Sequence, residues 1–82
     1  MPLTVLLNGT KQFFPDLQAP VDLPTVLGAL GFMPDRIAVE HNGEIVRRST
    51  WINALVEEGD KLEVVHFVGG GSVDQVFFAR FV

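Results

Sequence analysis

The segment LTVLLNGTKQFF, residues 3–14, is the part of the sequence that decides the fold. The apolar residues at positions 3, 5 and 7 recur with a period of two, which is typical of a strand with one apolar face. Asn8-Gly9 predicts a tight turn, because both residues tolerate positive φ. Residues 11–14 then return as a second strand. The segment is therefore predicted to form a β-hairpin.

One helix is predicted after this hairpin, from about Pro24 to Leu30. Asp22 can cap it, and Pro24 fits its first turn, where a missing N–H does no harm. Gly31 is expected to end it as a C-terminal glycine. The apolar residues of the segment fall at i, i+3, i+4 and i+7, on one face that should lie across a sheet: Leu23, Val26, Leu27 and Leu30.

A second hairpin is predicted further along, with strands over residues 36–41 and 44–46 joined by an Asn42-Gly43 turn. Residues 15–20 are expected to be a loop. Residues 49–55 are expected to be a turn of helix or an irregular loop, pinned by Trp51 and Leu55.

Residues 61–68 are predicted to be the last strand. Hairpin, helix, hairpin, loop and strand in this order predict an α+β fold of the β-grasp, or ubiquitin-like, type, with a mixed sheet of four or five strands and one helix across it. The predicted core residues are Leu3, Val5, Leu7, Val26, Leu27, Leu30, Ile37, Val39, Leu62 and Val64. Whether the odd or the even residues of each strand point toward the core is left undecided, because a shift of one residue exchanges the two faces.

The composition limits the classes of protein to which the chain can belong. Eighty-two residues make one domain, and the net charge of −4 comes with no basic stripe of the kind that binds nucleic acid. An acidic chain is better suited to basic protein surfaces. The absence of cysteine excludes a disulfide framework, an iron–sulfur cluster and a thiol nucleophile. No stretch has the length of a membrane span, and no signal-peptide pattern opens the chain, so a cytoplasmic location is expected.

The last strand leads into three glycines and then into a hydrophobic extension. Three segments follow: residues 1–68 form the β-grasp domain, residues 69–71 form a glycine tail, and residues 72–82 form the extension. Glycines offer a backbone that takes any conformation and passes through a channel too narrow for a Cβ. Taken alone, three glycines are more often a flexible linker or turn.

The polar residues suggest no catalytic or metal site. Two histidines without cysteine have no metal-ligand spacing. His66 is expected to be a half-buried strand residue with a hydrogen-bond partner, and His41 to be solvated. Glu58 and Asp60 flank a turn glycine and are interpreted as turn formers. Ser72 has no partnered histidine and aspartate motif that would make it a nucleophile.

Three residues are candidates for docking a partner protein: Arg47, Arg48 and Trp51. Arginine and tryptophan are over-represented in binding hot spots. The plainer alternatives, solvated loop arginines and a core or loop-anchoring tryptophan, are favoured on the residues alone.

Several segments resemble, in order and spacing, the ThiS family of sulfur carriers in thiamine biosynthesis. The segments are LNG at 7–9, TVLGALG at 25–31, AVEHNGEIV at 38–46, RS-x-W at 48–51, LVEEGD at 55–60 and EVVHFVGGG at 63–71. Each is weak alone, and the series over residues 3–71 is specific. Arg47 stands where the family often has proline, which affects a loop. The extension after Gly71 is the larger departure, because such carriers end at the glycines.

The resemblance implies a co-substrate and not an enzyme. Gly71 would carry the sulfur as a thiocarboxylate, and Gly69 and Gly70 would thread the tail into the partner. A ThiF-like adenylyltransferase, of the ubiquitin-activating type, would join the carboxylate to AMP with ATP and Mg²⁺. A persulfide from a cysteine desulfurase or sulfurtransferase would then displace AMP, and a ThiG-like thiazole synthase would take the sulfur. No catalytic residue, metal or bound cofactor is expected on the carrier itself.

Three other functions are left open by the residues. A related carrier could serve another pathway, such as molybdopterin synthesis. A ubiquitin-like modifier would join the same glycine to a lysine. A non-covalent binding module would use its sheet face, and would not need the glycines.

The extension, residues 72–82, has three possible origins: a removable pro-segment, a cloning addition, or part of a truncated fusion. While it is attached, the carbonyl of Gly71 lies in a peptide bond and cannot be activated. Three phenylalanines and three valines in eleven residues are costly to leave in water. The extension is therefore predicted to pack on the sheet or on a second copy, which would cause self-association and block activation.

Overall fold

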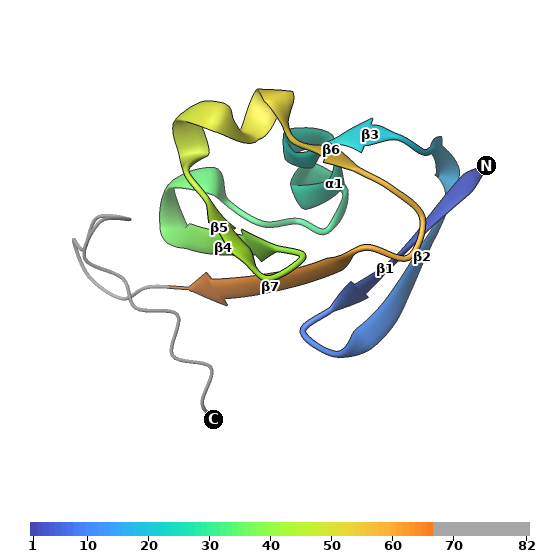
Figure 1. The fold of residues 1–82 in the computed structure, drawn as a ribbon, viewed down its shortest axis with the longest axis horizontal. Helices are drawn as coiled ribbons and strands as arrows, with labels where there is room; N and C mark the ends of the chain where they lie inside the picture. The colour runs from blue at the N-terminus through green and yellow to red at the C-terminus, as the bar shows by residue number, and fades with distance from the viewer. Residues whose placement is uncertain (67–82) are drawn as a thin grey trace.

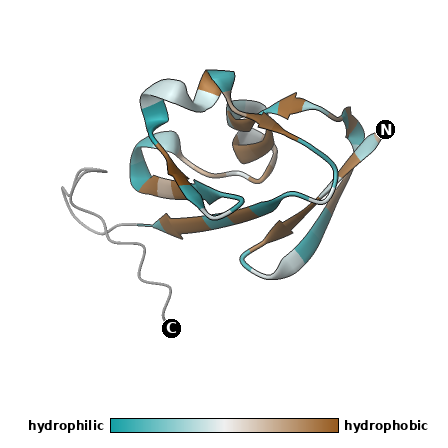
Figure 2. Cartoon of the chain, in the orientation of Figure 1, coloured by the Kyte–Doolittle hydropathy of each residue, from teal (hydrophilic) through white to brown (hydrophobic). Residues whose placement is uncertain are grey.

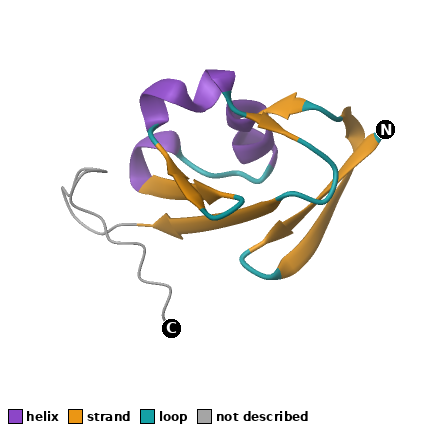
Figure 3. Ribbon diagram, in the orientation of Figure 1, coloured by secondary structure: helices purple, strands orange, loops and turns teal. Residues whose placement is uncertain are grey.

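The computed structural model describes residues 1–66, which form a mixed five-stranded sheet of order β2-β1-β7-β4-β5, a two-stranded sheet of β3 and β6, and one α-helix (Figures 1 and 3). The strands are β1 Pro2–Leu7, β2 Thr10–Gln18, β3 Val21–Asp22, β4 Ile37–His41, β5 Glu44–Val46, β6 Leu55–Val56 and β7 Lys61–His66. The helices are α1 Leu23–Ala29 and two 3₁₀ helices, η1 Pro34–Arg36 and η2 Arg48–Asn53. β1 and β7 are parallel and the other pairs antiparallel, which confirms the predicted β-grasp fold.

Both Asn-Gly turns form as predicted. Asn8 and Gly9 have φ of 49° and 85°, and Asn42 and Gly43 have φ of 51° and 89°. Positive φ at both central residues is the mark of a type I′ turn, whose twist matches that of the strands it joins. β1 therefore pairs directly with β2, and β4 with β5.

The ends of α1 also follow the sequence signals. The Asp22 side chain caps the helix, because its Oδ1 accepts hydrogen bonds from the Thr25 amide at 2.9 Å and the Thr25 hydroxyl at 2.8 Å. At the other end, Gly31 has φ of 82° and its amide donates to the Gly28 carbonyl at 3.0 Å. The Phe32 amide donates to the Leu27 carbonyl at 3.1 Å, which completes a Schellman motif. The helix begins one residue before the predicted start.

Two short segments differ from the prediction. Residues 15–18, expected as a loop, continue β2. Pro15 is tolerated there because β2 is at the edge of the sheet, where a strand can lack an amide donor. Leu55, expected to pin its loop, is 52% exposed, whereas the next residue, Val56, is fully buried and pairs with Val21. Two-residue strands such as β3 and β6 are too short to produce a sequence period.

The core lies between α1 and the sheet, and strands 1, 4 and 7 bury their alternate residues against the helix (Figure 2). The predicted core residues are buried except for Leu7 and Leu30, which are partly buried and pack against the core. The structure adds buried hydrophobic residues that the prediction omitted: Val21, Leu23, Ala38, Trp51 and Val56.

Replacing a buried leucine of β7 should destabilise the whole fold. Leu62 is fully buried, so Leu62→Ala removes core contacts and is expected to lower the free energy of unfolding by about 2–5 kcal/mol. Leu55→Ala, at a half-exposed site, is the matched control and should change it by less than about 0.5 kcal/mol. Urea unfolding measures both. Equal losses in the two variants would contradict the assigned core.

Candidate functional site

β7 is the strand that leads into the glycines, and it lies at the centre of the sheet between β1 and β4 (Figure 1). On one side it runs parallel to β1, with Leu6 opposite Lys61. On the other side it runs antiparallel to β4 from Leu62, opposite His41, to His66, opposite Ile37. The strand that precedes the glycines in the sequence is thus the central strand of the sheet.

Asn8 extends the pairing of β1 with β7 beyond the end of β1. Its backbone amide donates to the Leu62 carbonyl at 2.8 Å. Its side chain then accepts a bond from the Val64 amide at 2.8 Å and donates one to the Val64 carbonyl at 3.2 Å. A side-chain amide carries the same donor and acceptor as a peptide group. Asn8 therefore takes the place of one further residue of strand.

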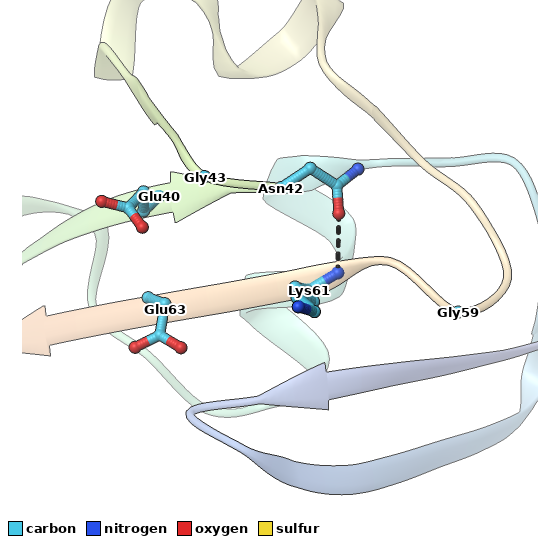
Figure 4. A pocket seen from close by; sticks show the side chains of 6 residues that line it. All are labelled: Glu40, Asn42, Gly43, Gly59, Lys61 and Glu63. Atoms are coloured by element: carbon cyan, nitrogen blue, oxygen red, sulfur yellow. Dashed lines mark hydrogen bonds between the residues drawn. The ribbon is translucent and has the colours of Figure 1, made fainter.

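Asn42, in the other Asn-Gly turn, holds the opposite side of β7 at its beginning. Its backbone amide donates to the Lys61 carbonyl at 2.9 Å, and its side-chain oxygen accepts from the Lys61 amide at 2.9 Å (Figure 4). The two turns thus bond to β7 from opposite sides and at different points along it.

The turn before β7 is bonded to β1. The Thr4 amide donates to the Glu58 carboxylate at 2.7 Å, and the Gly59 amide donates to the Thr4 carbonyl at 2.8 Å. The Leu6 amide donates to the Asp60 carbonyl at 2.9 Å. Glu58 and Asp60 are turn formers, as predicted, and the turn fixes where β7 begins.

His41 was expected to be solvated, and that prediction is wrong. Its side chain is only 16% exposed, and its Nε2 lies 2.8 Å from Oδ2 of Asp60. The same oxygen accepts a bond from the Glu57 amide at 2.8 Å. Burial raises the pKa of Asp60, but the bonds from Glu57 and His41 outweigh it and hold the pKa below its usual range. The contact ties the end of β4 to the turn before β7.

His66, at the end of the described part of β7, is exposed and not half-buried as expected. Its ring centroid lies 5.3 Å from that of Phe32, the residue that follows the end of α1. The ring contact joins the last described residue of β7 to the helix.

A hollow of about 490 Å³ lies on the sheet face opposite α1, between the turn of the second hairpin and the turn before β7 (Figure 4). The charged residues lining it are Glu40, Lys61 and Glu63. Glu40 and Glu63 are opposite one another on β4 and β7, so two carboxylates meet on this face.

The three predicted docking residues fall in different environments. Trp51 is 3% exposed, and its indole N–H donates to the Val46 carbonyl at 2.9 Å. It belongs to the core, as the plainer interpretation held. Arg47 and Arg48 are exposed at the start of η2, where the Arg48 guanidinium donates to the Pro34 carbonyl at 3.3 Å. No observation tests their contact with a partner.

The predicted sulfur-carrying and threading residues, Gly71, Gly70 and Gly69, lie outside the described residues, as does the extension 72–82. Within residues 1–66, no three histidine or acidic side chains come together as metal ligands. No helix in that same range is long and apolar enough to cross a membrane.

The model of the ThiS family matches residues 5–71. Two solved structures of a ThiS thiamine biosynthesis protein from Geobacter metallireducens share the fold. The crystal structure matches with a TM-score of 0.70 and 28% identity, covering 84% of this chain and 100% of that one. The solution structure matches with a TM-score of 0.67 and 25% identity, covering 98% of this chain and 99% of that one.

Sequence relatives include two thiazole synthases. That of Paramagnetospirillum magneticum is 40% identical over 85% of this chain, and that of Magnetococcus marinus is 39% identical over 84%. The chain spans only about a fifth of their length, 21% and 20% respectively. An uncharacterised protein, ycf40, of Pyropia yezoensis is 36% identical over 84% of this chain and 93% of its own length.

The Asp60 contacts predict an acid-dependent contribution to stability. The pKa of Asp60 is lower in the folded state than its unfolded value of about 3.9, so the ionised carboxylate stabilises the fold at pH values above that unfolded pKa. This contribution is lost as the pH falls through the folded-state pKa. Asp60→Asn should therefore be less stable than the wild type at neutral pH, and the difference should shrink below about pH 4. Asp16→Asn, exposed on β2, is the control and should stay close to the wild type. Urea unfolding from pH 7 down to pH 3 measures this, and a gap that widens in acid would refute it.

Proposed function

The chain belongs to the ThiS family, and from this we propose that it is a sulfur carrier of thiamine biosynthesis. The observation that carries the proposal is the extent of the family match, which continues past β7 and ends at Gly71. β7, bonded to β1 on one side and to β4 on the other, is held up to His66, three residues before Gly69 in the sequence. The carrier would supply a reactive chain end and a docking surface, and its partners would supply the catalytic groups.

The chemistry begins at the carboxylate of Gly71. A carboxylate is an unreactive acyl group, so a ThiF-like adenylyltransferase joins it to AMP, using ATP and Mg²⁺ and releasing pyrophosphate. A persulfide sulfur then attacks the carbonyl carbon, the C–S bond forms and AMP leaves. A second thiol then attacks the donor's sulfur in the resulting acyl disulfide: a new disulfide forms between the donor and that thiol, the original S–S bond breaks, and a thiocarboxylate is left on Gly71. Gly69 and Gly70 let the tail enter the nucleotide site, because they carry no Cβ.

Thiazole synthase is the proposed acceptor of the sulfur. A segment similar to this chain occurs within two proteins named thiazole synthase. This supports a functional link between the proposed sulfur carrier and thiazole synthase. The sulfur donor would be a cysteine desulfurase or a sulfurtransferase.

The carboxylate of Gly71 has to be exposed before any of these steps. In the 82-residue chain the Gly71 carbonyl is in a peptide bond with Ser72, so removal of residues 72–82 is part of the proposal. Light scattering of the 82- and 71-residue forms should show whether the extension causes self-association.

A chain that ends at Gly71 should accept sulfur. Incubated with the activating enzyme, ATP, Mg²⁺ and a sulfide source, it is expected to gain the mass difference between sulfur and oxygen, while the 82-residue chain should not change. Intact-protein mass spectrometry reads the result. A higher-mass conjugate with a lysine would identify a protein modifier, and adenylation of the 82-residue chain at Val82 would overturn the need for processing.

A side chain at the last glycines should block activation without affecting the fold. In the Gly71-terminated chain, Gly71→Val and Gly70→Val are expected to reduce pyrophosphate release more than Gly71→Ala and Gly70→Ala, because the larger side chain obstructs the narrow channel more. Unfolding curves should stay the same, since the identified core residues lie between Leu3 and Val64. Unchanged turnover in Gly71→Val would refute the threading mechanism.

A further inference from the structure

Asn8 makes the contact of the first hairpin that lies furthest along β7 among residues 1–66. Resting on the proposed function, we infer that Asn8 is a positioning residue for activation: it fixes the end of β7 and thereby the point from which the glycine tail starts. Asn8 is neither one of the acidic residues and histidines nor one of the predicted docking residues discussed above.

The need for Asn8 follows from the geometry of the two strands. The chain reverses at the Asn8-Gly9 turn, so β1 ends there and β2 returns on its other side, while β7 continues in the direction of β1. From that point β1 offers β7 no further backbone. Both side-chain hydrogen bonds of Asn8 go to Val64. One side chain therefore pairs with the backbone N–H and the backbone C=O that face the place where β1 has ended. These bonds are partly buried, and unpaired backbone groups in such a place are costly.

The Asn8–Val64 contact is close enough to the reacting group, the carboxylate of Gly71, to affect where that group is placed. Gly71 is seven residues beyond Val64, which an extended chain spans in at most about 25 Å. Without Asn8, the end of β7 would be held by β4 alone, through the pairs that reach His66. The tail would then start from a less defined point and direction. A reacting group that is not held in place loses much of its rate advantage.

Asn42 provides a matched control within the same molecule. It has the same residue type, the same turn type and nearly the same φ, 51° against 49° for Asn8. It also bonds β7 through its side chain, but at Lys61, ten residues before Gly71. Glycine tolerates positive φ, so Asn8→Gly and Asn42→Gly both keep the turn and remove only the side-chain amide. Comparing the two separates the position of the contact from a general loss of stability.

The experiment measures pyrophosphate release by the activating enzyme with the Gly71-terminated chain and its two variants, at a temperature where all are folded. Asn8→Gly is expected to lower kcat about tenfold with KM unchanged, because docking is intact and the reacting group is misplaced. Asn42→Gly should stay within about twofold of the wild type in both constants. A raised KM with unchanged kcat in Asn8→Gly would overturn the inference, since it would mean a direct contact with the partner.

A second measurement does not depend on the partner. ¹⁵N relaxation of the 82-residue chain should show lower order at Val65 and His66 in Asn8→Gly and not in Asn42→Gly. Should Asn8→Gly not fold, Asn8→Asp takes its place; it keeps an acceptor for the Val64 amide and puts an oxygen against the Val64 carbonyl. Equal kcat and equal order in the variants at positions 8 and 42 would overturn the inference and leave the proposed function standing. A wild-type chain that releases no pyrophosphate would refute the proposed function, and the relaxation result would still decide whether Asn8 fixes the end of β7.

Discussion

The rest of the structure depends on the insertion of β7 between β1 and β4. β7 comes last among the described strands, yet it occupies the centre of the sheet, and its Leu62 and Val64 complete the core beneath α1. A central strand requires partners for its backbone groups on both sides. β4 supplies them from Leu62 to His66, whereas β1 supplies them only until its hairpin turns back, and there the side chain of Asn8 continues the ladder.

The same constraint connects the fold to the proposed chemistry. A carrier that reacts through its own chain end needs a rigid body up to the point of exit and conformational freedom beyond it. The turn before β7, bonded to Thr4, and the His41–Asp60 contact fix the beginning of the strand, and Asn8 fixes its far part. Glu58, His41 and Asp60 thus act as structural braces. Fold alone does not assign a function, and here the family match through Gly71 supplies what the sheet does not.

The sequence by itself determined the local elements and the family. Both Asn-Gly turns, the cap at Asp22 and the stop at Gly31 were predictable, because each rests on the backbone preferences of one or two residues. Alternating strands and the helical spacing of Val26 and Leu27 gave most of the core, since burial on one face leaves a period in the sequence. The order of the motifs up to Gly71 was sufficient for the resemblance that the family match then confirmed.

Only the tertiary structure decided which distant groups meet. Nothing in the sequence period places His41 against Asp60, buries Trp51 beneath its loop, or brings the Asn8 amide to Val64, because each contact depends on strand order and not on neighbours along the chain. For the same reason, the sequence did not predict that β3 pairs with β6 over two residues or that β2 continues past Pro15. A turn can be specified by two adjacent residues, whereas the role of Asn8 exists only once β7 lies beside it.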